Sequence, residues 1–209
     1  MNLSKNKKVL RNLIQLIFLL LFSFLVFKGN VQIWIIIFGF GLLISLIWGR
    51  FYCGWICPIN TVLRIKNWIY NKLNTNVFEP PKFIKRGWIR WIILVSFIAT
   101  MIISRRLNVQ INMILYLLIA AFIISLIFDE EMWHKYLCPY SALINLTDKT
   151  NNKRLLIDDK LCKSCGICAN NCPNNIILNV NNKYSIQSKE CLKCFKCQDV
   201  CEFNAIKNK

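Results

Sequence analysis

Four apolar stretches divide the first 128 positions of the chain. They cover residues 13–27, 31–48, 88–104 and 109–128, with short polar turns at 28–30 and 105–108. A bilayer-spanning helix needs about 20 apolar residues, so the first stretch is short unless it extends to Val9 and Arg11 reaches the interface with its long side chain. The pattern predicts an all-α transmembrane four-helix bundle built from two helical hairpins, and it favours a retained anchor over a cleaved signal peptide.

A different periodicity follows the second apolar stretch. Apolar residues recur at helical spacing among basic ones over residues 58–73. This is typical of a basic amphipathic helix lying on a membrane surface, with docking of an acidic partner as the alternative. Residues 145–154 are polar and rich in turn formers, and indicate a linker. The predicted domains are therefore a transmembrane domain over 1–144 and a second domain over 155–209.

The basic residues indicate how the chain lies in the membrane. Four precede the first apolar stretch, eight lie from Arg50 to Arg90 and twelve from Lys135 onward, which leaves only Lys28, Arg105 and Arg106 in the two short turns. Because basic residues concentrate on the cytoplasmic side, we expect a multi-pass protein of the cell (cytoplasmic) membrane with both termini in the cytoplasm. The net charge of +17 is thus explained by topology, and nucleic acid is not expected as a partner.

The cysteine content indicates a redox function in addition to the predicted membrane location. The chain is 56% hydrophobic, and eight of its 11 cysteines fall within residues 162–201. Two runs follow the spacing C-x2-C-x2-C-x3-C, and each cysteine of the second run follows its counterpart by 29 residues. Structural zinc sites have no use for a third regularly spaced cysteine, and disulfides do not persist in the cytoplasm. The runs predict two [4Fe–4S] clusters in a small α+β ferredoxin-like domain.

The ligand sets follow from the rule that the fourth cysteine of each run serves the other cluster. The first cluster is assigned Cys162, Cys165, Cys168 and Cys201, and the second Cys191, Cys194, Cys197 and Cys172. The second run departs from the bacterial pattern, with Phe195 where glycine is usual and Glu202 where proline is usual. The fourth cysteine of each run is expected to start a short helix. Residues 176–187 predict a β-hairpin around Asn181 and Asn182.

Two further cysteine motifs lie at the ends of the second and fourth apolar stretches. One is Cys53-x3-Cys57-Pro58; the other places His134 where its first cysteine would stand, before Cys138-Pro139. Both stretches run toward the cytoplasm, so Cys53, Cys57, His134 and Cys138 are expected to meet at the membrane face. They could hold a third cluster or a mononuclear iron or zinc ion. The alternative, small packing residues or a redox thiol pair, stays open.

With these motifs the chain resembles the NapH-like membrane ferredoxins over nearly its whole length. The resemblance implies a membrane-anchored electron-transfer protein, an electron-transfer subunit such as a quinol dehydrogenase component, that links the quinone pool or a cytoplasmic donor to a partner redox enzyme. The alternative is an assembly or regulatory protein for another metalloenzyme. A single histidine and the lack of C-x-x-C-H argue against haem, and no covalent-flavin motif is present. No catalytic residue is assigned.

Overall fold

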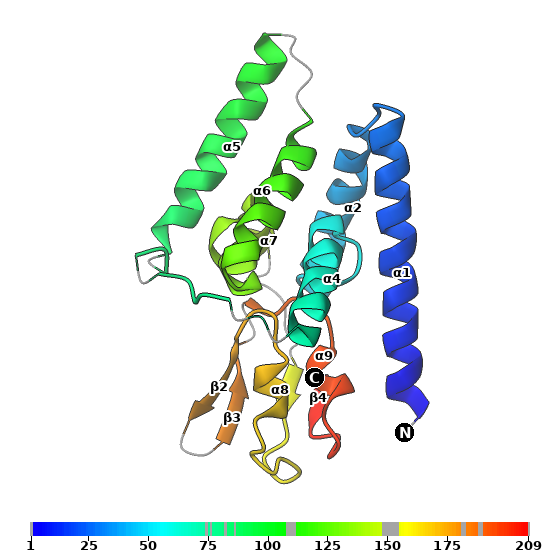
Figure 1. Cartoon of the computed structure of the whole chain (residues 1–209), viewed down its shortest axis with the longest axis vertical. Coiled ribbons are helices and arrows are strands. Elements are labelled where there is room, and N and C mark those ends of the chain that lie inside the picture. The colour runs from blue at the N-terminus through cyan, green and yellow to red at the C-terminus, as the bar shows by residue number, and fades with distance from the viewer. Residues whose placement is uncertain are drawn as a thin grey trace.

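The structure is a computed structural model that describes residues 2–73, 75, 77–81, 83–85, 87–107, 112–147, 155–180, 183–187 and 190–208. Figure 1 shows two parts, a group of long helices above and a small group of strands and short helices below. The start of α1 lies beside the lower group. The predicted turn at 105–108 and linker at 145–154 fall partly outside the described residues.

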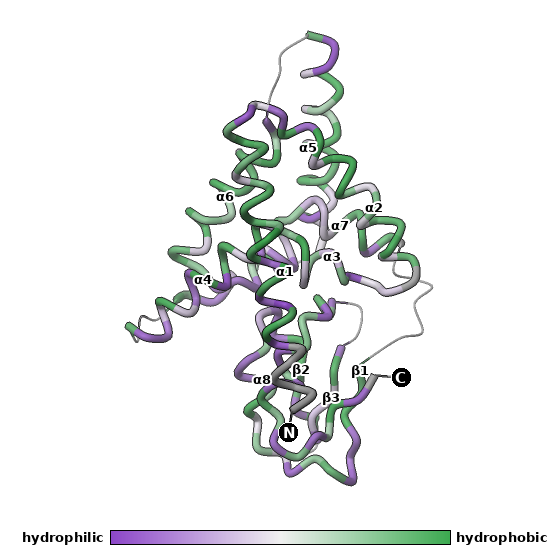
Figure 2. The backbone as a smooth tube through the Cα atoms, turned by 90° about the vertical axis from the view of Figure 1, so that its right-hand side faces the viewer, coloured by the Kyte–Doolittle hydropathy of each residue, from purple (hydrophilic) through white to green (hydrophobic). Residues whose placement is uncertain are grey.

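The four apolar stretches form helices α1 (Asn2–Phe27), α2 (Ile33–Trp48), α5 (Trp88–Arg106) and α6 (Met113–Ile127). Figure 2 shows their predominantly hydrophobic character. Two are long and apolar enough to cross a membrane, over Lys8–Phe27 and Trp88–Arg106, whereas α2 and α6 are shorter apolar helices. Gly49, with φ of 62°, ends α2, and α3 (Phe51–Trp55) follows it at once.

Shorter helices follow α2 and α6. The predicted amphipathic helix is α4 (Pro58–Lys72), and it leaves Ile65 and Trp68 exposed. After α6, a π-helix η1 (Met132–Leu137) leads into α7 (Pro139–Thr147). Pro58 and Pro139 are first in their helices, where a missing N–H costs nothing. Helix α7 runs to Thr147, past residue 144 where the first domain was predicted to end.

The lower part contains two antiparallel strand pairs and two short helices. Strand β1 (Leu155–Ile157) pairs with β4 (Ile206–Asn208), with Ile157 opposite Ile206. Strand β2 (Ile177–Val180) pairs with β3 (Lys183–Ile186), with Ile177 opposite Ile186, which confirms the predicted hairpin. Residues 181 and 182, where its turn was predicted, lie outside the described residues.

The short helices correct one prediction. Helices α8 (Ile167–Asn170) and α9 (Lys196–Asp199) contain the third cysteine of each run and end before the fourth. The fourth cysteine therefore follows a helix and does not start one. The reason is the residue before each helix: Gly166 and Phe195 have φ of 77° and 55°, and this left-handed conformation turns the chain into a helix immediately after the second cysteine.

The 29-residue repeat extends to the backbone. Positive φ angles occur at Ser164 and Lys193, at Gly166 and Phe195, and at Asn175 and Asn204, and the members of each pair are 29 residues apart. The second loop thus adopts the conformation of the first although Phe195 replaces glycine. Its ring lies 6.2 Å from that of Trp55 in an edge-to-face contact, so the side chain that makes this conformation costly also contacts the helical part.

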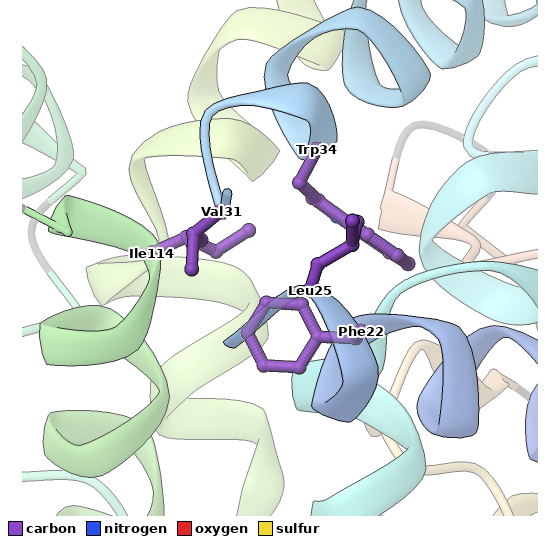
Figure 3. Packing of buried hydrophobic residues seen from close by; sticks show 5 residues of the cluster. All are labelled: Phe22, Leu25, Val31, Trp34 and Ile114. Atoms are coloured by element: carbon purple, nitrogen blue, oxygen red, sulfur yellow. The ribbon is translucent and has the colours of Figure 1, made fainter. Parts of the chain in front are cut away.

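The upper helices pack through large apolar side chains. Figure 3 shows one such cluster, in which Phe22 and Leu25 of α1 meet Trp34 of α2. Val31 and Ile114 complete it. The Phe22 and Trp34 rings are 5.2 Å apart, and the Trp34 indole donates a hydrogen bond of 2.9 Å to the Tyr52 hydroxyl. Since an indole N–H needs a partner when buried, this bond ties α2 to α3.

Candidate functional site

The eight ferredoxin cysteines surround two separate cavities. One is lined by Cys162, Cys165, Cys168 and Cys201, together with Tyr184. The other is lined by Cys172, Cys191, Cys194 and Cys197. Each cavity thus meets three cysteines of one run and the fourth of the other run, and four cysteine sulfurs are the donor set that a [4Fe–4S] cluster needs.

The two sets differ in exposure. Cys165 is exposed, whereas Cys197 is buried and Cys191 is partly buried. Burial raises the pKa of the Cys191 thiol to about 12 and raises that of Cys197 as well. Thiols of this kind stay protonated unless a metal binds, so loading a metal there releases protons.

The loop of the second set lies directly on α3. A Cβ atom on Gly54 would lie 2.4 Å from the Leu192 carbonyl oxygen and 3.2 Å from the Cys194 amide nitrogen. The Trp55 indole donates a hydrogen bond of 3.1 Å to the Lys193 carbonyl. Gly54 stands between Cys53 and Cys57, and only glycine permits this close approach.

Charged side chains hold the same loop from two other helices. Arg50 forms an ion pair of 2.7 Å with Glu190, and its Nε donates a hydrogen bond to Asn145 at 2.9 Å. Arg90 of α5 pairs with the other Glu190 oxygen at 3.1 Å. Because the Arg50 side chain is fully buried, it depends on Glu190 for neutralisation.

Helix α1 makes a third set of contacts with this loop. Arg11, with only 2% of its side chain exposed, pairs with Asp199 of α9 at 3.0 Å and donates to the Cys194 carbonyl. Gln15 donates a hydrogen bond of 2.7 Å to the Gly54 carbonyl. The Arg11 guanidinium therefore binds the ferredoxin domain, and its position relative to a membrane interface stays a prediction.

Three membrane-face cysteines come together beneath this loop. Cys53 and Cys194 pack against one hydrophobic cluster, Cys57 packs against the same cluster and against the one that contains Cys138, and all three thiols interact electrostatically. Burial and, to a smaller extent, the nearby Cys138 together raise the pKa of Cys57 to about 12. The backbone amides of Asn60 and Ile59 act in the opposite direction, as expected at a helix N-terminus.

His134, in η1, is buried, and its Nε2 has no hydrogen-bond partner among the described residues. Burial and, to a smaller extent, the positive charge of Arg50 together lower the pKa of His134 to about 4. The imidazole is therefore neutral at ordinary pH, the form that binds metals. In the part of the chain that the structure describes, however, no three His, Cys, Asp or Glu side chains are arranged around a single-ion site.

Sequence reasoning missed the residues that join the two parts. Glu190, which pairs with Arg50, and Gln15, which donates to the Gly54 carbonyl, were not among the predicted site residues. A sequence signal did exist for Gln15, because it lies one helical turn after Arg11 and so shares its face. Nothing marked Glu190 except its place just before Cys191.

Two family models match the chain in the regions that contain these cysteines. A 4Fe-4S binding domain matches residues 30–76, which contain Cys53 and Cys57, and a 4Fe-4S dicluster domain matches residues 154–202. No solved structure matches the chain.

Several of the similar curated proteins are described as ferredoxin-type. The chain is 26% identical to the ferredoxin-type protein NapH of Haemophilus influenzae over 73% of this chain and 59% of that protein. It is 29% identical to the methylamine utilization ferredoxin-type protein MauN of Methylorubrum extorquens over 59% of this chain and 47% of that protein. It is 28% identical to an uncharacterized protein of Methanocaldococcus jannaschii over 95% of this chain and 94% of that protein.

The chain thus spans about half of the length of several relatives, and nearly all of one. The matches agree with the cysteine spacing and with the two four-cysteine cavities. The chain is therefore similar to NapH-like, ferredoxin-type 4Fe–4S proteins, and family models for 4Fe–4S binding match both of its cysteine-containing regions.

Proposed function

We propose that the chain is a membrane-anchored electron conduit between the quinone pool, or a cytoplasmic donor, and a partner redox enzyme. The observation that carries this proposal is the contact between Gly54 and the loop at Leu192 and Cys194. It places a cluster-binding loop against a cysteine motif at the end of an apolar helix. Iron–sulfur clusters, when bound, supply one-electron transfer, and a conduit needs such centres close together.

The two cysteine sets have different roles in this proposal. The set of Cys172, Cys191, Cys194 and Cys197 faces the helices, because Arg11 and Trp55 hold its loop. The set that contains Cys165 lies away from these contacts, and Leu161, Ile167 and Phe203 are exposed near it. Exposed apolar residues around a redox centre suit transient contact with a partner. We assign the set that contains Cys165 to the partner and the set of Cys172, Cys191, Cys194 and Cys197 to the membrane side.

Four membrane crossings are part of the proposal. Helices α2 and α6 have 16 and 15 residues, or about 24 and 22 Å at 1.5 Å per residue, less than the roughly 30 Å of a bilayer core. The short helices α3 and η1 follow α2 and α6, and they continue each apolar segment toward the ferredoxin domain. Both termini are then cytoplasmic. A reporter fused after residue 209 should be cytoplasmic and one inserted at 28–30 external; the opposite result would contradict this orientation.

The proposed function is tested by measuring which electron donors reduce the clusters. The full chain in membranes should have its clusters reduced by ubiquinol or menaquinol analogues, seen as bleaching of cluster absorbance and as signals of reduced [4Fe–4S] centres. Dithionite, which needs no binding site, sets the fully reduced level. Reduction by a cytoplasmic donor but by neither quinol would leave the conduit in place with that donor. If neither works, with the clusters intact, the assembly or regulatory function becomes the better one.

A further inference from the structure

A pocket of about 530 Å³ lies among the upper helices, and none of the ferredoxin cysteines lines it. Its walls come from α2, α5, α6 and α7 and include Trp34, Phe38, Phe97 and Tyr140. Val31, Trp34 and Ile114 of Figure 3 form one side of it. This volume is within the range of small-molecule sites, which are mostly apolar with a few polar groups.

The pocket exists because α7 is too short to fill the space between α2 and α5. Helix α7 has nine residues and α5 has 19, which corresponds to about 13 and 28 Å. Tyr140, near the start of α7, packs edge-to-face on Phe38 of α2 at 4.3 Å and on Phe97 of α5 at 5.5 Å. The space that α7 leaves is lined by Met101 and Ile114, and exposed Gln32 and Arg105 mark its mouth.

The inner end of the pocket lies next to the membrane-face cysteines. Tyr140 lines the pocket and follows Cys138 by two residues, and it packs against the clusters that contain Cys53, Cys57 and Cys138. Trp34 lines the pocket too, and its indole binds the Tyr52 hydroxyl. A ligand in the pocket would therefore be separated from the thiols by one layer of aromatic side chains.

We propose that this pocket binds the head group of a membrane quinone. Flat aromatic walls suit a quinone ring. The polar side chains at the mouth can donate hydrogen bonds to the carbonyl oxygens of the ring. Because a quinone is dissolved in the lipid, a pocket that faces the lipid can take it up. An acyl chain would have no use for the polar groups at the mouth. The inference rests on the proposed function, to which it adds a binding site.

The test measures binding apart from electron transfer. The purified full chain, reconstituted with its clusters, is titrated with short-chain ubiquinone and menaquinone. Met101→Trp places a larger ring in the pocket, whereas Ile102→Trp makes the same kind of change at the next residue of α5, which is 55% exposed and outside the lining. We expect Met101→Trp to lower the affinity for at least one quinone by about tenfold or more and Ile102→Trp to leave it within about twofold.

Iron content and cluster absorbance must match wild type in both variants, and Met101→Leu, which keeps the pocket apolar and similar in volume, should bind like wild type. Equal affinities in all variants would mean that the quinone only partitions into the lipid, and would overturn the proposed site. The same holds if the wild-type chain binds neither quinone.

If quinone binds as expected but quinol does not reduce the clusters, the site stands and quinol is excluded as donor. If quinol reduces the clusters while Met101→Trp binds normally, the conduit stands and the pocket does not.

Discussion

Arg50 and Glu190 form an ion pair of 2.7 Å that joins the end of α2 to the residue before Cys191. The Arg50 side chain is fully buried and that of Glu190 is 17% exposed. Arg90 and Asn145 also contact Glu190. One carboxylate therefore binds side chains from α5, from α7 and from the start of α3. This arrangement makes Glu190 the main charged link between the cluster-binding loop and the helices.

Glu190→Gln should therefore loosen the docking of the ferredoxin domain without removing a cluster ligand. The change leaves two arginines without their carboxylate, and uncompensated buried charge costs about 3 kcal/mol. We expect faster hydrogen–deuterium exchange in residues 51–57 and slower reduction by a membrane donor, with unchanged iron content and unchanged reduction by dithionite.

Asp158→Asn is the matched control, because Asp158 pairs with Lys207 at 2.9 Å on the exposed side of the same domain. It should change neither exchange in residues 51–57 nor electron delivery. Equal exchange in wild type and Glu190→Gln would contradict a docking role for Glu190.

Gly54→Ala tests the close approach of the backbones. The new Cβ would lie 2.4 Å from the Leu192 carbonyl oxygen, so the loop must move away. Overpacking of this kind costs about 1–3 kcal/mol. Gly39→Ala in α2 is the control, because nothing lies within 4 Å of its added Cβ. A thermal-unfolding midpoint that falls for Gly54→Ala and not for Gly39→Ala is the expected result; equal midpoints would show that the loop does not rest on α3.

Much of this architecture was predictable because local patterns determine it. The cysteine spacing indicates two cluster loops, and Asn181 and Asn182 mark the hairpin between two apolar stretches. Proline after Cys57 and Cys138 marks the start of α4 and α7. Each signal lies within a few residues, so neither a partner segment nor a tertiary contact is needed to recognise it.

The contacts between the two parts could not be predicted in this way. Arg11 binds the Cys194 carbonyl across 183 positions, and periodicity contains no information about such pairs. Phe195 departs from the bacterial pattern at a position where glycine is usual, yet the left-handed conformation is kept and the ring packs against Trp55. The pocket was also missed, because it depends on the length of α7 relative to its neighbours.

Glu130 gives the protein a pH-dependent stability. The side chain is 1% exposed, and neither carboxylate oxygen has a hydrogen-bond partner among the described residues. Burial raises its pKa from 4.5 to about 7, and Asp129 adds to the rise, although Lys196, Lys66 and Arg64 act to lower it. The folded state therefore holds a proton that the unfolded chain loses above pH 4.5.

The stabilisation by this proton is complete below pH 4.5 and is lost as the pH rises through about 7. The difference between the pKa of Glu130 in the unfolded and the folded chain corresponds to roughly 3 kcal/mol in the free energy of unfolding. Glu130→Gln keeps the neutral shape, so its unfolding midpoint should exceed that of wild type at pH 8 and match it at pH 4.5. Glu79→Gln, at an exposed acid, should follow wild type at both values. A constant difference between Glu130→Gln and wild type at the two pH values would contradict the raised pKa.

We propose that Cys53, Cys57, His134 and Cys138 hold a third cluster. The structure brings Cys53, Cys57 and Cys138 together, His134 Nε2 is buried without a hydrogen-bond partner among the described residues, and a 4Fe-4S binding domain model covers residues 30–76. Protein purified without oxygen should then contain about 12 iron atoms per chain, compared with about 8 for the two ferredoxin clusters alone. Cys138→Ala and His134→Ala should both lower the count to about 8.

Cys165→Ala serves as the reference for losing a ferredoxin cluster, because it removes a ligand of the first set and should also lower the count by about four. The spectra separate the two kinds of loss, since the Cys138 and His134 variants should keep both ferredoxin signals. If only Cys138→Ala loses iron, the site has three cysteine ligands and His134 is a packing residue. A wild-type count near 8, with no zinc and no change in Cys138→Ala, would mean that the three buried thiols are packing residues or a redox pair, and that the electrons cross from α3 to the Cys194 loop without a metal centre between them.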